Sequence, residues 1–120
     1  MADLQLGVIE TRFAEIIWEN EPIVSSAIVK LAEARLSWKK STTYTVLKRL
    51  CGKGIFQNNN GTVSSLISRQ EFFALQSERF VEDTFAGSLP AFLAAFSSRK
   101  KLSAEEVTKL REMVAAYEEE

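Results

Sequence analysis

Four hydroxyl-bearing residues flanked by basic ones are the part of this sequence best suited to recognising a ligand. They are Ser41, Thr42, Tyr44 and Thr45, whose hydroxyls can donate to or accept from the base edges and phosphates of DNA. Residues 34–69 around them contain seven lysines and arginines but no aspartate or glutamate. Because the whole chain has a net charge of −1, this local excess of positive charge predicts a polyanionic partner such as double-stranded DNA.

The spacing of apolar residues predicts three helices that would position these hydroxyls. The first is expected over residues 6–18, the second after the N-cap residues Ser25 and Ser26, and the third from an N-cap at Ser41 or Thr42 to about Cys51. The residues expected to face inward are Leu6, Ile9, Phe13, Ile16 and Ile17 in the first helix, Ile28, Leu31 and Ala32 in the second, and Val46, Leu47 and Leu50 in the third.

A β-hairpin is expected directly after the third helix. Asn60-Gly61 is a strong turn signal between strands at 55–57 and 62–67, because both residues tolerate positive φ. Three helices followed by a hairpin are typical of a winged helix-turn-helix, in which the start of the third helix enters the major groove. The basic residues expected to reach phosphates are Lys39, Lys40, Lys48, Arg49 and Lys53.

The rest of the chain, from about residue 68 onwards, predicts three more helices and a different role. Capping boxes begin at Ser68 and Ser103, Gly87 and Pro90 interrupt the helical pattern, and this part is acidic. We therefore expect a mainly α protein with a small β-hairpin wing, divided into a winged-helix DNA-binding domain (1–69) and a three-helix dimerisation arm (70–120). The residues expected to dimerise it are Phe80, Phe92, Phe96, Val107, Leu110, Val114 and Tyr117.

Composition excludes several other classes of protein. The chain has no histidine and only one cysteine, Cys51, which argues against an internal disulfide, a zinc or thiolate metal site, histidine-based acid–base chemistry and an enzyme with a cysteine nucleophile. No apolar run approaches the roughly 20 residues that a membrane-spanning helix needs. A cytoplasmic protein without membrane insertion, metal or cofactor is therefore expected.

Several short motifs together resemble the penicillinase and methicillin-resistance repressors of Gram-positive bacteria, the BlaI/MecI type. These motifs are Glu10 with Phe13 and Ile16-Ile17-Trp18, Trp38 with Thr42, Thr45-Val46-Leu47, Arg49-Leu50 and Lys53-Gly54, the run 66–72, and Leu102-Ser103 with Glu105-Glu106 and Leu110-Arg111. The resemblance implies a homodimer that binds dyad operators of β-lactam resistance genes. It also implies that Ser41, Thr42, Tyr44 and Thr45 face the bases.

The resemblance further implies inactivation by a membrane-bound sensor metalloprotease, or by a process it starts, which cuts the arm. The corresponding bond here is Ala95–Phe96, where the family has asparagine in place of Ala95. A second departure is the wing, which is longer and basic in the family but uncharged here over residues 57–65. A third is the absence of the cysteine-rich tail of copper-responsive relatives, so a copper sensor is not expected.

Two other functions are compatible with the sequence. A winged helix can serve as a protein-interaction module, which the uncharged wing favours. A small-molecule-responsive repressor would need a pocket, for which the aromatic residues of the arm are the best candidates: Phe72, Phe80, Phe85 and Phe92.

Overall fold

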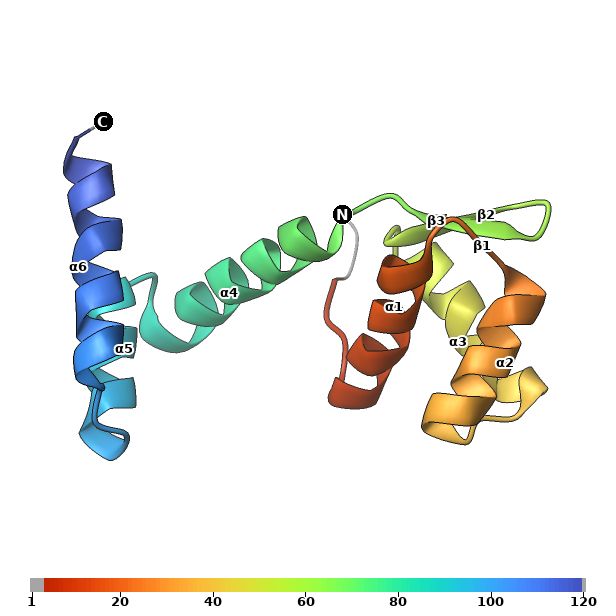
Figure 1. Cartoon of the computed structure of the whole chain (residues 1–120), viewed down its shortest axis with the longest axis horizontal. Coiled ribbons are helices and arrows are strands. Elements are labelled where there is room, and N and C mark those ends of the chain that lie inside the picture. The colour runs from red at the N-terminus through yellow and green to blue at the C-terminus, as the bar shows by residue number, and fades with distance from the viewer. Residues whose placement is uncertain (1–3, 120) are drawn as a thin grey trace. The chain divides into compact units, whose positions relative to one another are not determined.

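The computed structural model describes residues 4–119 and is mainly α with a small antiparallel sheet, as the sequence predicts (Figure 1). The elements run in the order α1 (Val8–Asn20), β1 (Ile23–Val24), α2 (Ser25–Leu36), α3 (Lys40–Gly52), β2 (Phe56–Asn59), β3 (Thr62–Ser65), α4 (Arg69–Phe85), α5 (Leu89–Arg99) and α6 (Ala104–Glu118). The chain divides into two compact units, one ending at Ser77 and the other beginning at Glu78. This division falls inside α4, beyond the boundary expected after residue 69.

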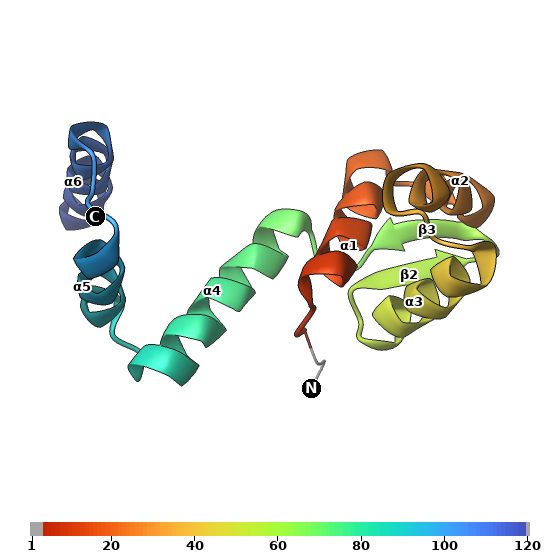
Figure 2. The same cartoon turned by 90° about the horizontal axis from the view of Figure 1, so that it is seen from below.

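The first unit packs α1, α2 and α3 against a three-stranded sheet in the order β1-β3-β2. Figure 2 shows β2 and β3 side by side, and α1 contacts β3 while α3 contacts β2. The hairpin turns at Asn60-Gly61, where φ is 53° and 94°, as the sequence predicts. Strand β1, in which Ile23 pairs with Val63 and Val24 with Thr62, was not predicted, because two residues are too few to produce a recognisable strand pattern.

The hydrophobic core of the first unit contains most of the residues expected to face inward. The buried members are Phe13, Ala14, Ile17, Ile23, Ile28, Ala32, Val46, Leu47, Leu50, Ile55, Phe56, Val63 and Phe72. The prediction for Ile9 was wrong, since its side chain is 48 % exposed. Because α1 begins at Val8 and not at Leu6, Ile9 lies in the first turn of the helix, and Ala14 is buried further along.

Two predicted N-caps were wrong. Val24 occupies the N-cap position of α2, because β1 leads directly into that helix and the Ser25 N–H donates to the Gly61 carbonyl at 2.8 Å. Lys39 occupies the N-cap position of α3, so the two hydroxyls expected to cap it lie within its first turn. There they remain available to a partner outside the protein.

The second unit contains the end of α4 together with α5 and α6. The ends of these helices lie close to where the sequence predicts them. Ser103 and Glu106 form the predicted capping box, with reciprocal hydrogen bonds of 2.9 and 3.0 Å. The backbone turns between α4 and α5 at Ala86 and Gly87, both with positive φ. Pro90 lies in the first turn of α5, where proline costs no hydrogen bond. None of the described residues of this unit is fully buried.

Candidate nucleic-acid interface

Helix α3 has one buried face and one exposed face. Thr43, Val46, Leu47 and Leu50 point into the core, at intervals of three, one and three residues. The same spacing that buries these positions turns the intervening residues outward. The exposed face carries Lys40, Ser41, Thr42, Tyr44, Thr45, Lys48 and Arg49. All four predicted base-reading residues therefore lie on the exposed face of one helix.

The hydroxyls on this face differ in what they can still bind. Those of Ser41 and Thr42 make no hydrogen bond to any described residue, so each can donate and accept. The Thr45 hydroxyl donates to the Ser41 carbonyl at 2.9 Å, which leaves only its lone pairs and its methyl group for a partner. The Tyr44 hydroxyl lies 3.5 Å from the Ser25 hydroxyl at the start of α2, so Tyr44 faces the boundary between the two helices.

Four of the seven basic residues in the acid-free stretch are engaged within the protein. Arg35 pairs with Glu19, Arg49 with Glu10 and Arg69 with Glu15, at 3.1, 3.2 and 3.4 Å. The Lys53 ammonium donates to the Gln5 carbonyl at 2.7 Å. The three carboxylates come from α1, outside the acid-free stretch, so the folded protein brings negative charge back towards three of the seven basic residues.

The remaining three are Lys39, Lys40 and Lys48. All three side chains are exposed, and their ammonium groups make no ion pair or hydrogen bond with the described residues. Lys39 and Lys40 stand at the start of α3, and Lys48 lies one turn beyond Tyr44 and Thr45. Of the five residues predicted to contact phosphates, these three are exposed and have a charge that no described residue pairs with.

The wing is attached to the start of α2. The Gly61 carbonyl accepts the Ser25 N–H, and the Ser25 hydroxyl in turn lies beside that of Tyr44. A chain of contacts therefore connects α3, the first residue of α2 and the turn of the hairpin. Ser25 was predicted only as a cap and this junction was not predicted, since its one signal in the sequence is the position of Ser25 immediately after Ile23-Val24.

Both tryptophans serve to pack the first unit. The Trp38 ring stacks on Phe13 with their centroids 5.0 Å apart, just before α3 begins. The Trp18 indole donates to the Ile67 carbonyl at 3.0 Å and contacts the Phe72 ring. Cys51 is half-buried, and burial raises the pKa of its thiol, as expected for a packing residue rather than a nucleophile.

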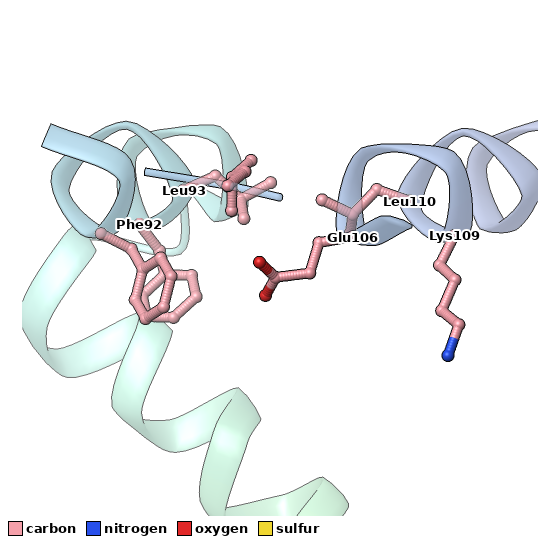
Figure 3. A pocket seen from close by; sticks show the side chains of 7 residues that line it. Phe92, Leu93, Glu106, Lys109 and Leu110 are labelled. Atoms are coloured by element: carbon pink, nitrogen blue, oxygen red, sulfur yellow. The ribbon is translucent and has the colours of Figure 1, made fainter. Parts of the chain in front are cut away.

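The predicted dimerisation residues of the second unit fall into two groups. Phe92, Phe96 and Leu110 line an apolar hollow of about 340 Å³ between α5 and α6, together with Leu93, Leu102, Glu106 and Lys109. Figure 3 shows Phe92 and Leu93 across from Leu110, with the Glu106 carboxylate pointing into the space between the helices. The other group is open to solvent: Phe80 is 50 % exposed, Val114 58 % and Tyr117 80 %. Val107 is half-buried.

The four phenylalanines considered for a ligand pocket have different surroundings. Phe72 is buried in the first unit, against Trp18. The rings of Phe80, Phe85 and Phe92 instead contact one another edge to face, with centroids 5.7–6.0 Å apart. Aromatic rings attract one another in this edge-to-face geometry, and the Phe92 ring of this cluster also lines the hollow between α5 and α6.

The predicted cleavage position lies inside a regular helix. Ala95 and Phe96 are both in α5, several residues from either end, and Phe96 is 42 % exposed. The Phe96 carbonyl accepts the Lys100 N–H at 3.1 Å. The bond between Ala95 and Phe96 is therefore in helical backbone.

A bundle of three helices whose third helix leads into an antiparallel hairpin, with an exposed polar face on that third helix, defines a winged helix-turn-helix. The comparisons with known proteins agree with this class. The model of the penicillinase repressor family matches residues 6–116, so the chain belongs to that family. It is 23 % identical over 117 residues to the penicillinase repressor of Bacillus licheniformis, covering 94 % of this chain and 91 % of that protein.

Membership makes the chain a DNA-binding transcriptional regulator rather than an enzyme. The described residues include no cluster of three or more histidine, cysteine, aspartate or glutamate side chains suited to a metal ion. No described helix is long and apolar enough to cross a bilayer.

Proposed function

We propose that this chain is a homodimeric repressor of β-lactam resistance genes, each subunit placing α3 in the major groove of one half of a dyad operator. The observation that carries this proposal is the exposed face of α3, where four hydroxyl residues lie between uncommitted lysines. Hydroxyls and methyl groups suit base edges, and ammonium groups suit the phosphates on either side.

The lysines would position the helix and the hydroxyls would read the sequence. Lys39 and Lys40 stand before the hydroxyl residues and Lys48 after them, so the charges bracket the reading surface. Phosphate contacts of this kind supply affinity that is independent of sequence. Discrimination would then come from Ser41, Thr42 and Thr45, with Tyr44 reaching the edge of the groove beside α2.

The exposed apolar side chains of the second unit support dimerisation. This unit leaves Met113, Val114 and Tyr117 on α6 between 58 % and 80 % exposed, and it lacks a fully buried residue of its own among those described. An apolar surface of this kind is typically covered by a partner. We expect a second copy to cover it, because two linked winged helices bind with far higher affinity than one.

Loss of the arm would release the operator. A protease acts on extended chain, so a cut at Ala95–Phe96 requires α5 to unfold locally before cleavage. Phe96 lines the same hollow as Leu110, and the cut would separate α6 from α5. A membrane-bound sensor metalloprotease is the agent that we expect to begin this process.

Selection of duplexes from a random pool tests the function directly. The full chain should enrich a dyad sequence whose half-sites are one or more helical turns apart, roughly 34–36 Å per turn. A chain ending at Ala95 should sediment as a monomer and fail to retain that sequence. Enrichment of no sequence would favour the protein-interaction module, and a truncated chain that remains dimeric would overturn the release mechanism.

A further inference from the structure

The tip of the wing presents two side-chain amides that the protein itself does not use. Asn59 and Asn60 are exposed and their side chains make no hydrogen bond to any described residue. Their neighbours differ, since Asn58 accepts the Gly61 N–H at 2.8 Å and Gln57 donates to the Ser64 hydroxyl at 3.2 Å. The hairpin is thus closed by Gln57 and Asn58, while the two amides at its tip are left for an outside partner.

The tip is held in place and carries no charge. Its Gly61 carbonyl is bonded to the Ser25 N–H, and Thr62 pairs with Val24 of β1, so β1 and α2 anchor the end of the hairpin. Residues 55–68 contain no charged side chain. A rigid, neutral tip gains little from phosphates, whereas amides placed next to bases can make directed hydrogen bonds.

From these contacts we infer that Asn59 and Asn60 read A·T base pairs in the minor groove beside the α3 contact. The inference rests on the proposed function, because the tip reaches DNA only if α3 is docked. Adenine N3 and thymine O2 both accept hydrogen bonds in the minor groove, so an amide NH₂ can donate to either base. A G·C pair places the guanine 2-amino group there, which blocks that donation.

Sites selected by the full chain and by an Asn59→Ala/Asn60→Gly variant test this assignment. Glycine at position 60 keeps the turn, where φ is 53°, and removes only the amide. The wild type should enrich positions beside the α3 contact that demand A·T but do not distinguish A from T, since the minor groove cannot tell them apart. The double variant should lose that requirement and keep the α3 contact sequence.

Substitution with inosine distinguishes minor-groove recognition from any other cause of a preference for A·T pairs. An I·C pair lacks the 2-amino group but keeps the major groove of G·C. For the wild type, replacing the A·T pairs by G·C should weaken binding about three- to tenfold, the value of one or two hydrogen bonds, and I·C should restore it. Equal binding of the wild type to G·C and I·C duplexes would overturn the assignment. So would a double variant whose affinity for the A·T, G·C and I·C duplexes fell by the same factor.

The selection also distinguishes this inference from the function on which it rests. If the wild type enriches no sequence at all, the repressor proposal fails together with it. If the wild type enriches an α3 contact sequence but no degenerate A·T positions, only the role of the wing fails.

Discussion

The guanidinium of Arg49 and the carboxylate of Glu10 form an ion pair, 3.2 Å between Nη1 and Oε2, that joins α3 to α1. Lys48 precedes Arg49 on the same helix and makes no such pair with the described residues. Two adjacent basic residues therefore have different environments. The first has a charge available to DNA, and the charge of the second is already balanced.

This difference predicts different salt dependence for two substitutions. Lys48→Ala should reduce the slope of log K against log salt by about 1.8 for a dimer, because each phosphate contact contributes about 0.9. Arg49→Ala should leave the slope near that of the wild type and reduce the unfolding free energy by about 0.2–1 kcal/mol, the usual value of an exposed pair. Titrations of DNA binding at several salt concentrations measure the slopes. Equal losses for both variants would contradict the division of charges.

Phe72 should be essential to the stability of the first unit although it belongs to α4. Its side chain is 1 % exposed and its ring packs on Trp18, so Phe72→Ala should cost about 3–5 kcal/mol. Both tryptophans lie in the first unit, and their fluorescence in a urea titration reports on it. Phe80→Ala is the matched control, because Phe80 is half exposed in the second unit. If Phe80→Ala shifted the midpoint of the tryptophan transition as much as Phe72→Ala, the prediction would be wrong.

The hydroxyl of Thr45 should accept, and not donate, in recognition of a base. Its proton is directed to the Ser41 carbonyl, so its base partner must be a donor such as the amino group of adenine or cytosine. Thr45→Val preserves the shape and should weaken operator binding about two- to twelvefold without affecting the dimer. Thr108→Val in α6 removes an equivalent bond, to Ala104, and should leave DNA binding unchanged. If Thr45→Val bound the operator with the affinity of the wild type, this contact would be excluded.

A charge on the exposed face of α6 should separate the two subunits. Val114 is 58 % exposed on the same side of the helix as Leu110, and Val114→Lys would place an ammonium in the proposed interface. Sedimentation equilibrium should show a large shift towards monomer. Thr108→Lys adds the same charge on the opposite side of α6 and should not affect association. Dissociation by both variants, or by neither, would count against this interface.

The capping box of α6 should make the arm sensitive to acid. Hydrogen bonds from the backbone and side chain of Ser103 hold the pKa of Glu106 below its usual value, and Lys100 contributes to a smaller extent. A carboxyl whose folded-state pKa is lowered stabilises the fold above its unfolded pKa, and this contribution disappears as the pH falls through the folded value. Ser103→Ala keeps the backbone N–H and removes only the hydroxyl, so it should move the pKa of Glu106 part of the way up towards the ordinary glutamate value, as measured by NMR titration. An unchanged titration would contradict the contribution of the Ser103 side chain.

Local patterns predicted a large part of this structure. The positions of Val46, Leu47 and Leu50 follow from helical periodicity, the Asn60-Gly61 turn from the φ values that these residues tolerate, and the Ser103 capping box from a spacing of three residues. Each of these features depends on residues that are close in sequence. Short-range physical preferences are therefore enough to determine them.

The partners of the charged groups could not be predicted in this way. Glu10 is 39 residues from Arg49 in sequence, and Gln5 is 48 residues from Lys53. The folding of α1 against the other helices brings them together, so a count of charge along the chain overstated the number of cations available to DNA. The junction between Ser25 and Gly61 was missed for the same reason.

The small number of uncommitted lysines has a consequence for the living cell. If the three uncommitted lysines of the acid-free stretch supply the phosphate contacts of each subunit, a dimer makes about six, and a doubling of internal salt would weaken its binding about fortyfold. If all seven basic residues of the acid-free stretch contacted phosphates, the same doubling would weaken it several thousandfold by the same rule. A repressor with few ionic contacts is therefore far less affected by the potassium surges of osmotic stress than one that uses every basic residue of the stretch.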